Sequence, residues 1–138
     1  LMKLVIAGKG GQGVKFLGTL LGKILMRDYN VAVFFDYDAA SRGGDIIGYV
    51  VFDKDKIGNM TVDVADVLLQ FADVKKEIKH KEFIDGSKFS GDNPANMVGL
   101  GYLLKYFNID ISESEMKELI KKKVDENINA IKYGISLR

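Results

Sequence analysis

The chain has 138 residues, 47% hydrophobic and 28% charged, a balance that fits one folded domain rather than a disordered segment. Its 20 Lys and Arg residues against 19 Asp and Glu give a net charge of +1, which argues against a dedicated nucleic-acid or membrane-surface binder. The chain contains no cysteine and one histidine, which excludes a disulfide scaffold, a thiol nucleophile and any cysteine-held zinc or iron–sulfur site.

The first elements in chain order are a strand, a glycine turn, a helix and a second strand. Residues 4–7 are a short apolar run ended by glycines, which predicts a strand buried on both faces. Residues 14–28 predict a helix, and residues 31–37 predict the second strand. The apolar stripe of the helix is Val14, Leu17, Leu21 and Leu25, widened by Phe16, Leu20 and Ile24. This order is the opening of a doubly wound α/β fold.

The middle of the chain predicts a mixed sheet. Residues 38–45 are a loop by composition, and residues 46–52 predict a third strand. A connection of about eight residues is too short for a helical crossover, so we expect the third strand to be antiparallel to a neighbour. A turn region, a further strand, a short charged helix and a strand-and-loop segment are then expected at 53–63, 64–71, 73–83 and 84–92.

Three helices are predicted in the last third. Asn93 as N-cap and Pro94 at the first helical position begin one that reaches about residue 107. Ser112 and Glu115 have the spacing of a capping box and begin another, to about residue 123, and residues 125–133 form a last helix that ends at Gly134. We therefore predict one α/β domain over 1–138, a Rossmann-like three-layer fold with a mixed, mostly parallel sheet. No apolar run is about 18 residues long, so we expect a cytoplasmic protein.

The glycine turn is the first candidate site. Gly8, Gly10 and Gly13 fit the spacing G-x-G-x-x-G between a strand and a helix, and Gly11 and Gln12 lie between them. Glycines permit a tight turn and the close approach of a ligand or another chain, and the helix start favours an anion. A tight turn that binds nothing fits the same residues.

Two nucleotide-binding readings compete at this turn. In a nicotinamide or flavin site, Asp36 would bond a ribose, although a chain this short rarely holds such a domain together with a substrate domain. An ATP-binding loop needs Lys and then Ser or Thr after the last glycine, and Val14 and Lys15 stand there instead.

Four motifs in order resemble the gamma subunit of the 2-oxoacid:ferredoxin oxidoreductases, which include the pyruvate, 2-oxoglutarate and indolepyruvate enzymes. The first is Gly10-Gly11-Gln12-Gly13-Val14 at the turn, and the second is Ser41-Arg42-Gly43-Gly44 followed by the third strand and Asp53. The third is the helix sequence Ala95-Asn96-Met97-Val98-Gly99-Leu100-Gly101, and a weaker fourth comprises Asn127, Ala130 and Gly134. The family usually carries some thirty more residues where this chain has 73–93.

The resemblance implies a subunit of an enzyme that oxidatively decarboxylates a 2-oxoacid to acyl-CoA and CO2 and reduces ferredoxin. Thiamine diphosphate and iron–sulfur clusters would belong to partner subunits, coenzyme A would be a co-substrate, and this chain would hold no catalytic or metal-binding residue. The expected partners are the thiamine-diphosphate-binding and ferredoxin-like chains, or a second copy in a homodimer, and neither nucleic acid nor a membrane. The alternative is a stand-alone nucleotide-binding or regulatory domain.

The predicted cofactor-binding or subunit-contact residues lie in the two glycine loops and one helix. Arg42 would clamp a phosphate or carboxylate, or pair with an acid of a partner. We expect the second strand to lie beside the first, so that both loops share one edge of the sheet with Asn96. The full set is Gly8, Gly10, Gly11, Gln12, Gly13, Ser41, Arg42, Gly43, Gly44 and Asn96.

Overall fold

The computed structural model describes residues 1–38 and 43–138, so Ser41 and Arg42 lie outside the described residues. The chain divides into two compact units. Residues 1–85, the sheet unit, contain all the strands and one helix, and residues 86–138, the helical unit, contain the remaining helices. That the whole chain acts as one domain stays a prediction.

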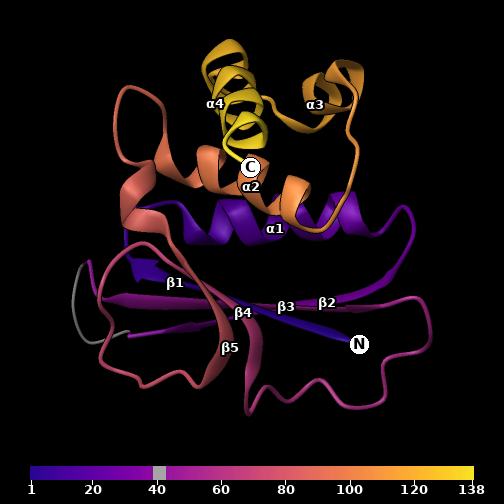
Figure 1. Ribbon diagram of the computed structural model, residues 1–138, viewed down its shortest axis with the longest axis vertical. Helices are drawn as coiled ribbons and strands as arrows, with labels where there is room; N and C mark the ends of the chain where they lie inside the picture. Colours follow the sequence, from indigo (N-terminus) through magenta and orange to yellow (C-terminus); the bar gives the residue numbers. More distant parts are fainter. Residues whose placement is uncertain (39–42) are drawn as a thin grey trace. The chain divides into compact units, whose positions relative to one another are not determined.

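The sheet unit contains a mixed sheet (Figure 1). It has five strands in the order β2-β3-β1-β4-β5. β3 is antiparallel to both of its neighbours, whereas β4 is parallel to β1 and to β5. The mixed sheet and its antiparallel third strand are therefore confirmed. The strands are β1 (Met2–Lys9), β2 (Asn30–Tyr37), β3 (Asp45–Asp53), β4 (Ala65–Gln70) and β5 (His80–Asp85).

The expectation that the second strand lies beside the first is wrong, because β3 lies between β1 and β2. The short connection after β2 folds β3 back against it, and β3 then pairs along its other side with β1. Two antiparallel pairings leave β1 and β2 pointing in the same direction. Their carboxyl ends therefore still meet at one edge of the sheet, where β3 begins.

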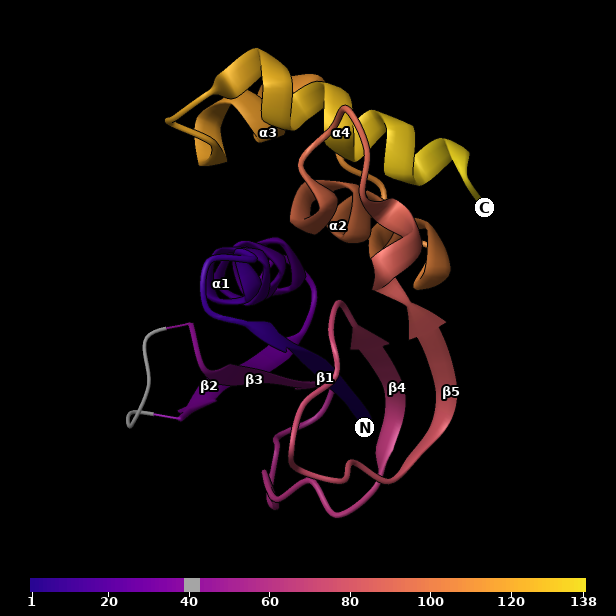
Figure 2. The same cartoon turned by 90° about the vertical axis from the view of Figure 1, so that its left-hand side faces the viewer.

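Helix α1 (Val14–Leu25) covers one face of the sheet (Figure 2). Its predicted apolar stripe is buried, but Phe16 is 43% exposed and does not widen that stripe. The helix ends three residues earlier than predicted. Below it, residues 4–7 of β1 are fully buried, as the apolar run predicted.

Within the sheet unit, loops pack against the other face of the sheet. Val5, Ala7, Ile47 and Tyr49 belong to an apolar cluster there, and Val62, Val74 and Ile78 pack against it from the segments before β4 and β5. The short helix predicted at 73–83 is wrong. Val74 and Ile78 are four residues apart, as on a helix, but they reach the cluster from an irregular segment, with bends at Lys75 and Lys76, that leads into β5.

The helical unit begins with a 3-10 turn and continues with three helices. Pro94 is the N-cap of α2, one position later than predicted, so Asn93 is not the cap. The predicted capping box is present at α3, where the Ser112 side chain accepts a hydrogen bond from the Glu115 backbone N–H at 3.1 Å. The elements are η1 (Gly86–Phe89), α2 (Ala95–Tyr106), α3 (Glu113–Leu119) and α4 (Val124–Ser136).

The backbones of α2 and α4 touch where the two helices cross (Figure 2). A Cβ atom on Gly101 would overlap the carbonyl oxygen of Ile131, and one on Gly134 would overlap that of Val98. The prediction that the last helix ends at Gly134 is therefore wrong. The helix continues to Ser136, and Gly134 is needed for its close approach to α2.

Candidate functional site

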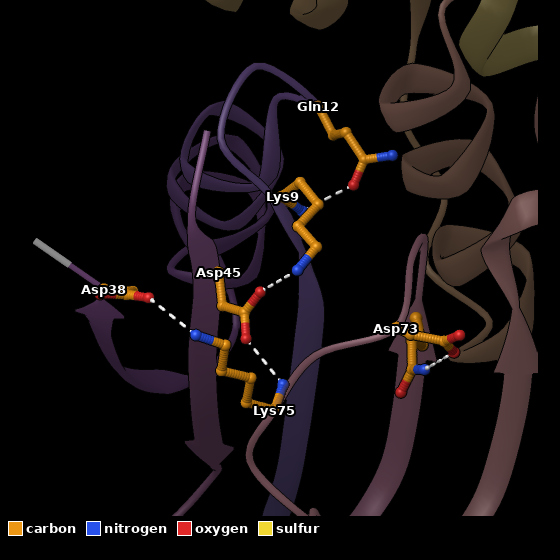
Figure 3. A network of polar contacts seen from close by, with 7 residues as sticks. Lys9, Gln12, Asp38, Asp45, Asp73 and Lys75 are labelled. Atoms are coloured by element: carbon orange, nitrogen blue, oxygen red, sulfur yellow. Dashed lines mark hydrogen bonds and ion pairs between the residues drawn. The ribbon is translucent and has the colours of Figure 1, made fainter. Parts of the chain in front are cut away.

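The glycine turn between β1 and α1 is stabilised by its own residues. The Lys9 backbone N–H donates to Gln12 Oε1 at 2.6 Å, and the Gln12 N–H donates to the Lys9 carbonyl at 3.1 Å (Figure 3). Gly11 has φ +90° and Gly13, the N-cap of α1, has φ +76°, and both values favour glycine. Gln12 therefore stabilises the turn with its side-chain oxygen.

The two glycine loops are in direct contact. The Gly10 N–H donates to the Gly44 carbonyl at 2.8 Å, and a Cβ atom on Gly10 would lie 3.1 Å from the Gly43 Cα. The expected meeting of the loops at one edge of the sheet is thus confirmed for Gly10, Gly43 and Gly44. Asn96 lies at the start of α2 in the helical unit, so its proximity to the loops stays a prediction.

Space remains above the two loops. Among the described residues, no atom lies within 4 Å of the position that a Cβ would take on Gly11 or on Gly43. A side chain there would nevertheless be strained, because Gly43 also has a positive φ of +72°. An open groove of about 580 Å³ adjoins the turn, where Val14, Phe16 and Thr19 line it together with the turn glycines. Within the described residues, the turn and the adjoining groove thus present backbone and apolar surface together with the side chains of Lys9, Lys15 and Thr19.

A polar network anchors this edge of the sheet (Figure 3). Asp45, at the start of β3, forms an ion pair with Lys9 at the end of β1 and accepts a hydrogen bond from the Lys75 backbone N–H at 2.7 Å. Its side chain is only 11% exposed. The Lys75 N–H, followed by the Lys9 ammonium, lowers the pKa of Asp45 below its ordinary value of 3.8. The network connects β1, β3 and the segment before β5.

Replacing Asp45 with asparagine is expected to remove part of the dependence of stability on pH. A carboxyl group whose pKa is lowered by folding contributes stability above its ordinary pKa of 3.8, and this contribution is lost as the pH falls through the folded pKa. Asp45→Asn should therefore lower the free energy of unfolding at pH 7 and change it less at about pH 2. Urea unfolding at both pH values tests this, and Asp63→Asn is the control in an exposed loop. Equal losses at the two pH values would contradict the assignment.

Sequence reasoning missed the roles of Asp45 and Lys75. Asp45 ends a loop of ordinary turn composition, and Lys75 contributes through its backbone N–H, which every residue except proline possesses. No pattern of side chains could have identified that contact. The glycine loops, in contrast, were visible because their spacing is unusual.

The described residues form no metal-binding constellation. No group of three or more His, Asp or Glu side chains within residues 1–38 and 43–138 is arranged to hold a metal ion. None of the helices in this part of the chain has the length and apolar character needed to cross a bilayer.

The arrangement at the glycine loops is suited to the close approach of another molecule to the backbone.

Comparison with known protein families identifies one family that this chain matches. The family model described as pyruvate ferredoxin/flavodoxin oxidoreductase matches residues 3–88, which include the glycine turn, Gly43 and Gly44, and all of the sheet except Met2. This match spans more than half of the chain. No curated protein sequence matches the chain.

Three solved structures share the fold. Pyruvate oxidoreductase subunit PORC from Thermotoga maritima has 16% identity and a TM-score of 0.70, with 98% of this chain and 95% of that chain covered. The gamma subunit of a keto/oxoacid ferredoxin oxidoreductase from Geobacter sulfurreducens has 18% identity and a TM-score of 0.64, with 99% and 97% covered. The 2-oxoglutarate:ferredoxin oxidoreductase from Magnetococcus marinus has 19% identity and a TM-score of 0.72, with 99% of this chain but only 30% of that chain covered.

Proposed function

Because the chain belongs to the pyruvate ferredoxin/flavodoxin oxidoreductase family, we propose that it acts as the gamma subunit of a multisubunit 2-oxoacid:ferredoxin oxidoreductase. The match over residues 3–88 carries this proposal, since it includes both glycine loops and the sheet that brings them together. The two solved relatives of nearly the same length, from Thermotoga maritima and Geobacter sulfurreducens, are themselves separate subunits by their descriptions, which supports a role as a subunit rather than a complete enzyme.

The complex would convert a 2-oxoacid and coenzyme A to acyl-CoA and CO2 and transfer the electrons to ferredoxin. Partner chains would carry the thiamine diphosphate and the iron–sulfur clusters, since this chain has no cysteine to ligate a cluster. The residues of this chain would bind and position rather than break bonds. We place the complex in the cytoplasm.

The glycine loops would supply a docking surface in this complex. At Gly11 and Gly43 an approaching group meets no Cβ atom and, among the described residues outside the neighbouring positions, no other atom close by. The adjoining groove offers apolar surface beside Val14 and Phe16. Arg42, between the described residues Asp38 and Gly43, would add a cation for a phosphate or for an acid of a partner. Asn96 would complete this surface if α2 reaches it in the complex.

Co-expression with the genes for the thiamine-diphosphate and ferredoxin-like chains tests the proposal. We expect an affinity tag on this chain to recover those subunits in equal amounts, together with 2-oxoacid-dependent and coenzyme A-dependent reduction of ferredoxin. The same preparation without this chain should lose most of that activity. A chain that stays alone under these conditions and binds a nicotinamide or adenine nucleotide at micromolar affinity would instead support a stand-alone nucleotide-binding domain.

A further inference from the structure

β5 forms one edge of the sheet, and its register against β4 decides which backbone groups face outward. The Ala65 N–H donates to the Lys79 carbonyl at 2.8 Å, and Ala65 lies opposite His80 in the parallel pairing. In such a pair, successive residues direct their amide groups alternately toward and away from the neighbouring strand. Lys81, Phe83 and Asp85 therefore face β4 with their amide groups, whereas His80, Glu82 and Ile84 direct theirs to the outer edge.

The side chains of Lys81, Phe83 and Asp85 lie on one face of the strand because they alternate along it. Phe83 is 51% exposed, and the Lys81 side chain is 69% exposed although it lies 3.3 Å from Asp66 of β4. An exposed aromatic side chain therefore lies between a cation two residues before it and an anion two residues after it. A second copy of the strand that runs in the opposite direction would therefore place its anion opposite this cation and its cation opposite this anion.

Antiparallel pairing of β5 with a second β5 is restricted to a few registers. Only residues whose amide groups face outward can exchange hydrogen bonds with the second copy, and in β5 these are every second residue. A two-fold axis must therefore pair one residue with the same residue of the second copy, and it cannot lie between two neighbouring residues of the strand. An axis through Glu82 would place two carboxylates opposite each other. An axis through Phe83 places Phe83 opposite Phe83 and Lys81 opposite Asp85 on both sides. These pairs are of the non-hydrogen-bonded kind, in which the side chains come closest.

We propose that a second copy of this chain pairs with it edge to edge through β5, with the two-fold axis at Phe83, to form a continuous ten-stranded sheet. Charged side chains on an edge strand normally discourage pairing with other strands. Here the charges select a strand with the opposite order of charges, which the reversed second copy supplies. The other edge, β2, contains only one charged residue, Asp36, and has no such complementarity.

Sedimentation of the isolated full-length chain tests the proposal. We expect a reversible dimer whose dissociation constant rises at least about tenfold in Phe83→Asp, which places two carboxylates at the axis, an effect of about 1.4 kcal/mol. Lys81→Asp and Asp85→Lys should each weaken the dimer, and the double variant should restore it, because the swap recreates the opposite-charge pairs. Circular dichroism melting checks that each variant is folded.

Two controls isolate the interface. Asp66→Asn removes the ion pair of Lys81 within the chain and should leave the dissociation constant within about threefold of the wild type. Phe34→Asp changes an exposed aromatic residue on β2 and should also leave the dimer intact. A wild-type chain that is monomeric at 100 μM, or a double swap that fails to restore the dimer, would overturn the proposal. The proposal would also be overturned if the wild-type chain is a monomer and the Phe83→Asp variant no longer binds the partner subunits. That result would leave the proposed function intact.

Discussion

Replacing Gly101 or Gly134 with alanine is expected to destabilise the protein by about 2 kcal/mol or more, within the range for overpacked sites. In an exposed helix the same change stabilises by about 0.5–1 kcal/mol, because alanine is the better helix former. At the α2–α4 crossing the new methyl group would lie well inside the 3.0 Å that real Cβ atoms keep from other atoms. The obstructing atoms are backbone carbonyl oxygens, which no change of side-chain rotamer can move, so the helices must separate.

Urea unfolding followed by circular dichroism measures this loss, and amide exchange should locate it in α2 and α4. Gly91→Ala is the matched control, because Gly91 lies in the loop before α2 and a Cβ there would meet no described atom within 4 Å. We expect the control to change the free energy of unfolding by less than about 0.5 kcal/mol. Equal stabilities of Gly134→Ala and Gly91→Ala would show that the helices do not approach as closely as described.

Replacing Gly10 with valine is expected to lower the activity of the reconstituted complex about tenfold or more, corresponding to 1.4 kcal/mol. The Cβ alone would lie 3.1 Å from the Gly43 backbone, and the two γ-methyl groups of valine need further space. The second loop would therefore have to move away, which breaks the hydrogen bond from the Gly10 N–H to the Gly44 carbonyl. The surface that we propose for docking depends on that contact.

The measurement is ferredoxin reduction together with recovery of the partner subunits on a tagged chain. Gly58→Val serves as the control, since Gly58 lies in an exposed loop of the same unit with no described atom within 4 Å of a Cβ. Unfolding curves at the assay temperature must show that both variants are folded. If Gly10→Val and Gly58→Val give complexes of equal activity, the contact between the loops has no part in docking.

The direction of the strands could be predicted from the sequence, but not their neighbours. A connection of about eight residues requires the third strand to reverse, and β3 does so. Connection length contains no information about the second neighbour of a strand, so the insertion of β3 between β1 and β2 was missed. The order depends on which apolar strand faces fit together, which is decided by contacts far apart in the sequence.

Local sequence patterns gave wrong predictions where a residue contacts a partner that is distant in the sequence. Val74 and Ile78 have helical spacing but cover the apolar cluster from an irregular segment. Glycine often ends a helix, but Gly134 lies inside α4, where the close backbone of α2 leaves no space for a Cβ atom. The capping box at Ser112 was predicted correctly because both of its partners lie within four residues. The glycine turn was located correctly for the same reason.

The central position of β1 imposes an order on folding during synthesis. β1 leaves the ribosome before both of the strands that it pairs with, β3 and β4, which end at Asp53 and Gln70. At a translation rate of roughly 5–20 residues per second, the apolar residues 4–7 therefore wait for seconds without a strand partner. Before β3 has been synthesised, α1 can form from neighbouring residues. A nascent chain stalled before β4 would thus leave one side of β1 without a strand partner, and unpaired strand edges favour aggregation.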